Sequence, residues 1–148
     1  MTRYQHTQVG YSMIWVPAAA AVLFAIGATF ESSPHRGILL AVSIVFVITI
    51  ALFYKLTIMI ESKTLRWWFG VGIISREVPL AEIVECEPIG IRWWYGWGIH
   101  RTPYGWLYNV SGLDALAISL RNGGKFALGT DDADGLTTAI RRSIDQQH

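Results

Sequence analysis

Cysteine is nearly absent from this chain, and so is any excess of charge. Cys86 is the only cysteine among 148 residues, so the chain can form neither an intrachain disulfide nor a cysteine-based metal site. This composition suits a domain that faces a reducing compartment. The formal net charge is only +1, which gives no strong field for a polyanion. We therefore discount nucleic acid as a partner.

Charge is also missing from two long segments near the N-terminus. Residues 13–30 and 37–54 contain no charged side chain, and only the polar break 31–36 separates them. A helix of about 18 residues is about 27 Å long, close to the hydrocarbon thickness of a bilayer. We predict a transmembrane helical hairpin over residues 13–56, with helices at 13–30 and 37–56, preceded by a cytoplasmic lead over residues 1–12. The alternative is a hairpin buried in a soluble protein, but neither run offers a polar face to water.

The positions of the basic residues predict the orientation of this hairpin. Lys55, Lys63 and Arg66 follow the second helix and Arg3 precedes the first, whereas the break contains only Arg36. Because basic residues favour the cytoplasmic side, both termini of this multi-pass membrane protein are expected in the cytoplasm. A secretory signal cleaved near the small residues 25–27 is the alternative for the first run.

After Leu56 the pattern changes from helical to β, which predicts one small domain over residues 57–148. Strand patterns occupy residues 57–61, 65–69, 73–78 and 80–87, and a β-hairpin turns at Asn122-Gly123-Gly124. An amphipathic helix should begin at Thr130 or Asp131, with an apolar stripe at Leu136, Ile140 and Ile144. We expect about six or seven strands followed by this helix.

Tryptophan is concentrated in residues 91–110 and in the pair Trp67-Trp68. Adjacent residues of a strand point to opposite faces, so Trp67 and Trp68 cannot both lie in the core of a sheet with one buried face. Some indoles must therefore be exposed, or be covered by membrane or protein. The later group consists of Trp93, Trp94, Trp97 and Trp106. We expect about half of these four to fill the core of the small domain.

Several short segments of the domain together resemble a known family. They are Gly96-Trp97-Gly98-Ile99-His100-Arg101, then residues 105–112 with the sequence GWLYNVSG, then Gly123-Gly124-Lys125-Phe126 and Gly129-Thr130-Asp131-Asp132 before the terminal helix. This succession resembles bacterial membrane-anchored pleckstrin-homology-like (PH-like) proteins, which implies that the membrane is the bacterial cytoplasmic (inner) membrane. The resemblance covers residues 57–148. It implies a PH-like fold: about seven strands in a bent antiparallel sheet, or a pair of near-orthogonal sheets, closed by a C-terminal helix. It also implies a binding scaffold without enzymatic activity.

No cluster of polar residues in the sequence predicts a reaction. His100 and Arg101 are the most suggestive pair, but no nucleophile is paired with them by a motif, and a surface pair on a strand is the simpler interpretation. Asp132 and Asp134 partly match a calcium loop, yet helix capping explains them better. Cys86 lies among glutamates, which raise a thiol pKa, and should be a packed, unreactive residue. We assign no cofactor and no metal.

Two functional hypotheses remain open. The first is a membrane-tethered adaptor that binds a protein partner or assembles with itself, through an aromatic face or a strand edge. The second is a sensor of anionic membrane lipids, in which Lys63, Arg66, Arg92 and Arg101 meet headgroups while tryptophans insert. Together the hypotheses use ten candidate binding residues: Lys63, Arg66, Trp68, Arg92, Trp93, Trp94, Trp97, His100, Arg101 and Trp106.

Overall fold

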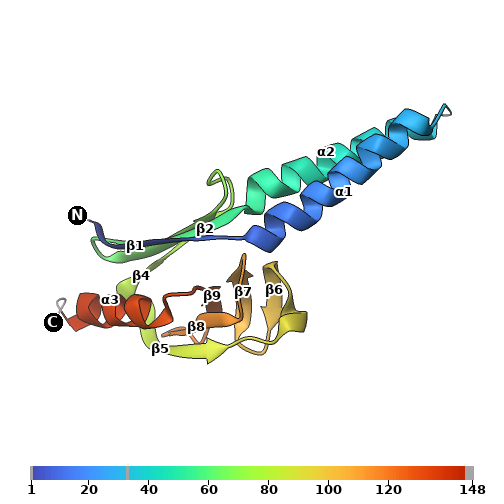
Figure 1. Cartoon of the computed structure of the whole chain (residues 1–148). Coiled ribbons are helices and arrows are strands. Elements are labelled where there is room, and N and C mark those ends of the chain that lie inside the picture. The colour runs from blue at the N-terminus through green and yellow to red at the C-terminus, as the bar shows by residue number, and fades with distance from the viewer. Residues whose placement is uncertain (1, 33, 146–148) are drawn as a thin grey trace.

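The chain is an α+β protein with two N-terminal apolar helices, a sheet-rich domain and a C-terminal helix, as predicted (Figure 1). The computed structural model describes residues 2–32 and 34–145. Its elements, in chain order, are β1 (Thr2–Val9), α1 (Tyr11–Phe30), α2 (His35–Phe53), β2 (Lys55–Glu61), β3 (Thr64–Phe69), β4 (Ser75–Pro79), the short 3₁₀ helix η1 (Leu80–Glu82), β5 (Ile83–Gly90), a second 3₁₀ helix η2 (Trp93–Tyr95), β6 (Gly98–Thr102), β7 (Gly105–Asn109), β8 (Asp114–Leu120), β9 (Lys125–Gly129) and α3 (Ala133–Asp145).

The helices α1 and α2 form the predicted antiparallel hairpin, with boundaries shifted by two or three residues. Both are long and apolar enough to cross a membrane. Their contact uses small side chains of α1: Ala21 and Ala28 are buried, and the Ser43 hydroxyl donates a 2.9 Å hydrogen bond to the Ala21 carbonyl. No residue of α2 is buried. The hairpin is therefore not buried in the core of this domain.

Residues 2–9 are a strand, which corrects the prediction of a lead outside the domain. β1 pairs antiparallel with β2, so that Gln5 lies opposite Met59 and Val9 opposite Lys55. The whole helical hairpin is thus the connection between two neighbouring strands. The sequence concealed this strand because β1 is mostly polar and its strand partner lies beyond two helices.

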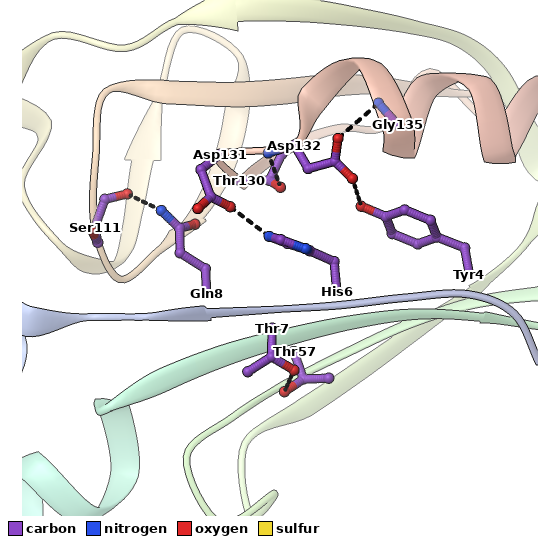
Figure 2. Close-up of polar contacts among 10 residues, drawn as sticks. All are labelled: Tyr4, His6, Thr7, Gln8, Thr57, Ser111, Thr130, Asp131, Asp132 and Gly135. Atoms are coloured by element: carbon purple, nitrogen blue, oxygen red, sulfur yellow. Dashed lines mark hydrogen bonds and ion pairs between the residues drawn. The ribbon is translucent and has the colours of Figure 1, made fainter.

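Polar side chains on one face of β1 point toward the segment that precedes α3 and form hydrogen bonds with it (Figure 2). The Tyr4 hydroxyl donates a 2.8 Å hydrogen bond to Asp132 Oδ2, and His6 Nε2 lies 2.5 Å from Asp131 Oδ1. Burial, followed by the hydrogen bond and charge of Asp132, raises the pKa of Tyr4 above its ordinary value. Its hydroxyl therefore stays protonated and keeps its role as donor.

The strands of the described residues form two sheets, which was one of the two expected arrangements, but they number nine rather than about seven. The first has the order β1-β2-β3-β4 and the second β5-β8-β9-β7-β6. Three of the strands have no counterpart among the expected ranges: β1, and β6 and β7, which form a hairpin inside the tryptophan-rich segment. The second sheet is not fully antiparallel, because β7 pairs parallel with β9, with Leu107 opposite Ala127.

The main core lies between the two sheets and under α3. Trp67 points into it and is 3% exposed, whereas Trp68 is half-buried on the opposite face of β3, as the alternation of a strand predicts. Leu136 and Ile140 of α3 are fully buried against this core. The helix begins after Asp132, whose Oδ1 accepts the Gly135 backbone N–H at 3.2 Å, which confirms the capping role.

The strands continue into the helices without a linker, and the backbone is hydrogen-bonded at this junction. The Gly10 N–H donates to the Tyr54 carbonyl at 2.9 Å, and the Gly70 N–H donates to the Lys55 carbonyl at 2.8 Å. Gly70 has a positive φ of 46°, and a Cβ there would collide with the backbone oxygen of Ala51. The β3–β4 turn is thereby fixed against the last turn of α2.

We predict that Gly70→Ala destabilises the protein by about 2 kcal/mol or more, because strain at positive φ is joined by a collision with backbone that cannot move away cheaply. Gly72→Ala is the matched control: its φ is also positive, at 93°, but the nearest atom to its added Cβ is Trp68 Cδ1, at 3.7 Å. Thermal unfolding in detergent, followed by circular dichroism, measures both. Equal losses would show that the turn is not tightly packed on α2.

We also predict that Asp132→Ala costs about 2 kcal/mol, the sum of a lost helix cap and a lost hydrogen bond to a half-buried hydroxyl. Tyr4→Phe removes only the second part and should cost about 1 kcal/mol. Asp134→Ala, at an exposed site in the first turn of α3, should change stability by no more than about 0.5 kcal/mol. Chemical denaturation of the three variants is the measurement, and similar losses for both aspartates would refute the specific role of Asp132.

Candidate functional site: an aromatic groove beside an open strand edge

β4 lies at the edge of the first sheet and pairs only with β3. Its residues Ser75, Arg76 and Glu77 are exposed, and Val78 is half-buried. Because one side of the strand has no neighbour in the sheet, the main-chain N–H and C=O groups on that side are available to another strand. Pro79 ends the strand, where its missing N–H removes no ladder bond. An open edge is a ready template for an extended peptide.

A groove of about 520 Å³ lies beside this edge, between the two sheets. Most of its lining is apolar or aromatic, and the charged side chains belong to exposed residues at its margin. Its lining residues are Trp67, Ile74, Arg76, Glu77, Val78, Ile99, Trp106, Tyr108, Leu120, Gly124, Lys125 and Phe126. The groove therefore combines an apolar floor with margins of both charge signs.

The β6–β7 hairpin supplies one wall of the groove. Ile99 lies opposite Tyr108 and Arg101 opposite Trp106, so these four side chains share one face of the hairpin. Leu107 points to the other face and is fully buried in a second, smaller core. Because successive residues of β7 point to opposite faces, Leu107 packs in the smaller core whereas Trp106 and Tyr108 border the groove.

Aromatic stacking forms the floor of the groove. The rings of Trp67 and Phe126 are stacked with centroids 4.8 Å apart, and Tyr108 meets Trp67 edge-on at 5.3 Å. The indole nitrogen of Trp67 is buried and has no hydrogen-bond partner among the described residues. The rings of Trp67, Tyr108 and Phe126 thus give the groove an apolar floor.

Ile74, Val78 and Phe126 of this groove were not among the residues predicted from the sequence. No local pattern could have identified them, because the groove depends on β4 being an edge and on β7 pairing with β9. Of the ten predicted residues, Trp106 lines the groove, and Arg101 lies across from it on the same face.

Three predicted residues lie on or beyond the outer face of the first sheet, away from the groove. Arg66 is exposed there, with its guanidinium 5.9 Å from the ring centre of Trp68. Lys63 is in the β2–β3 turn, at the end of the sheet opposite the helices. The seven residues of β2 separate this turn from α2 by about 20 Å at 3.3 Å per residue.

The connection between β5 and β6 holds most of the other predicted residues. Arg92 stacks over Trp94 at 4.9 Å, and His100 Nε2 lies 2.5 Å from the Trp97 carbonyl oxygen. None of the four later tryptophans fills the core: Trp93 is 75% exposed, Trp94 57%, Trp97 44% and Trp106 50%. The expectation that half would be buried is wrong, because η2 and the glycine-rich bend turn the first three outward, and Trp106 faces the groove.

The four cations of the lipid-sensor hypothesis are therefore not gathered on one surface. Lys63 and Arg66 belong to the far turn and outer face of the first sheet, Arg92 to the β5–β6 connection, and Arg101 to the β6–β7 hairpin. A joint contact of these side chains with one flat layer of headgroups is not supported by this placement.

Cys86 and the acidic residues provide no second site. Cys86 is buried, and burial raises the pKa of its thiol, an effect that Arg141 opposes and Glu85 reinforces. Over residues 2–32 and 34–145, no three His, Cys, Asp or Glu side chains are grouped as a metal site would need. The groove is thus the best-formed candidate for recognition.

The chain has also been compared with known proteins. No protein-family model matches it, and no curated protein matches it significantly. The assignment of a function therefore depends on the geometry described above.

Proposed function

We propose that this protein is a non-enzymatic, membrane-tethered binding module. In this proposal α1 and α2 cross the cytoplasmic membrane, and the groove beside β4 binds an extended segment of a protein partner. The observation that carries the proposal is the open edge of β4 bordering a groove with an aromatic floor. A strand edge offers main-chain hydrogen bonds, and the groove offers a place for alternate apolar side chains of the added strand.

The exposed surface of the hairpin supports membrane insertion. Ile44, Val45 and Ile48 of α2 are 58%, 60% and 52% exposed, and α2 has no buried residue. Water would disfavour this continuous apolar surface by about 25 cal/mol for each Å². Lipid would cover it, and both β1 and β2 would then lie on the same side of the bilayer. Lys55, at the start of β2 with its amine 5.2 Å from the Tyr54 ring, suits a cytoplasmic interface.

We also propose that the domain is a variant of the PH-like fold. Two sheets packed face to face and followed by a C-terminal helix support this assignment. The helical hairpin between β1 and β2 and the parallel pairing of β7 with β9 are departures from the expected pattern. Because a fold does not determine function, the binding proposal depends on the groove itself.

The topology leads to a direct prediction. In a Cys86→Ala background, a cysteine at Arg36, in the first turn of α2 beside the break, should react with a membrane-impermeant maleimide on intact bacterial cells. A cysteine at Lys63 should react only after permeabilisation, because the domain lies inside. Reaction of both positions on intact cells, or of Lys63 alone, would refute the proposed orientation.

The binding proposal predicts a position-dependent cross-link in the native membrane. A photo-reactive amino acid at Ile74 should attach to one extended segment of a partner, whereas the same amino acid at Arg66, on the outer face, should not. Trp106→Ala should weaken the Ile74 cross-link about tenfold to thirtyfold, since a central tryptophan contributes about 2 kcal/mol to many interfaces. Trp93→Ala is the matched control, because it removes an exposed indole that does not line the groove.

Mass spectrometry of the adduct defines the segment, and a synthetic peptide of that sequence should bind the purified protein with the same dependence on Trp106. A cross-link to a second copy of this chain would show that the groove mediates self-assembly and does not bind a different protein. Absence of any cross-link at Ile74, or an equal effect of Trp93→Ala, would refute the groove as the binding site.

A further inference from the structure

The end of the domain from which α1 and α2 leave carries exposed apolar side chains in two connections. Val71 and Ile73 belong to the β3–β4 turn and are 63% and 77% exposed; Trp93, Trp94 and Trp97 belong to the β5–β6 connection and are at least 44% exposed. We call these five residues the helix-end collar. None of them lines the groove proposed to bind a partner.

The β3–β4 part of the collar is fixed beside the base of α2. The hydrogen bond from Gly70 to the Lys55 carbonyl and the close packing of Gly70 on Ala51 hold the start of the turn there. Val71 and Ile73 follow immediately. Figure 1 shows this turn rising next to the end of α2.

The β5–β6 part of the collar is connected to the base of α1 through the β7–β8 connection. The Gln8 amide, at the end of β1, donates a 3.0 Å hydrogen bond to the Ser111 carbonyl (Figure 2). The Ile91 N–H donates a 2.7 Å bond to the Leu113 carbonyl, and Trp93 and Trp97 line a small pocket with Leu113. In Figure 1, β6 and β7 accordingly lie beneath the base of α1.

The chemistry of the collar is unusual for surface turns, which are ordinarily polar. The turns at the β2–β3 and β8–β9 connections follow that rule, with Ser62-Lys63 in one and Asn122-Gly123 in the other. The collar has instead three indoles and two aliphatic side chains, and the guanidinium of the adjacent Arg92 stacks on Trp94. Indoles beside aliphatic groups match the boundary between headgroups and acyl chains, where tryptophan is enriched.

We propose that the helix-end collar rests in the interfacial layer of the bilayer that α1 and α2 cross, an inference that depends on the membrane insertion proposed above. Because the contact is apolar and aromatic, it forms equally well with zwitterionic and with anionic lipids. It adds two supports, one on each side of the helix pair, to the backbone junction at Gly10 and Gly70. The domain is then held in one orientation, with the groove of β4 at a fixed height above the lipid.

Nitroxide labels on the full chain test this contact. Single cysteines replace Val71 or Trp94 in the collar, Lys63 or Trp106 outside it, and Leu23 in α1, all in the Cys86→Ala background. Trp106 is the matched control for Trp94, since the two indoles are 50% and 57% exposed. The labelled proteins are reconstituted in vesicles of phosphatidylcholine, with and without phosphatidylglycerol. Collision rates with a water-soluble nickel chelate and with oxygen then report the depth of each label.

We expect the labels at Val71 and Trp94 to collide with the nickel chelate at least about fivefold less often than those at Lys63 and Trp106, in both kinds of vesicle. The Leu23 label should be reached by oxygen and not by nickel.

If the collar labels are as accessible to nickel as Lys63 while Leu23 remains protected, the collar proposal is refuted and membrane insertion stands. If Leu23 is also accessible to nickel, both fail. Protection that needs phosphatidylglycerol would overturn the apolar contact in favour of an electrostatic one. Circular dichroism of each labelled protein establishes that it is folded.

Discussion

The structure depends on the uninterrupted passage of two paired strands into two packed helices. β1 and β2 are neighbours in a sheet, and the Gly10–Tyr54 hydrogen bond closes their pairing where α1 begins and α2 ends. A helix pair joined by a flexible linker would leave the domain free to rotate. Here the backbone hydrogen bonds between β1 and β2 fix the orientation of the helices relative to the first sheet, and Gly70 adds a second contact with α2. The position of every other surface relative to the helices follows from this junction.

This constraint separates surfaces of the domain that differ in chemical character. The far turn at Lys63 is removed from the helices by the length of β2, so its charge is of little use to a contact near them. The connections nearest the helices are apolar, and the groove beside β4 opens between the sheets. One chain thus offers a surface suited to lipid and another suited to an extended peptide, without either competing for the same residues.

Local patterns predicted the helices, the opposite faces of Trp67 and Trp68, the last hairpin and the cap of α3, since each depends on residues close in sequence. The strand β1 escaped prediction because its apolar content is low and its partner is separated from it by two helices. The exposure of Trp93, Trp94 and Trp97 escaped for a related reason. Composition alone suggests that a tryptophan is a core residue, and only the 3₁₀ turn η2 and the glycine-rich bend after it show that these indoles point outward.

The groove illustrates why a site can be invisible in a sequence although each of its residues is ordinary. Phe126 and Trp67 would read as core residues, and both are buried, but their stacked rings also form the floor of a groove because β4 ends the first sheet there. Whether an apolar face is core or binding surface depends on strand order, which is set by pairing between distant segments.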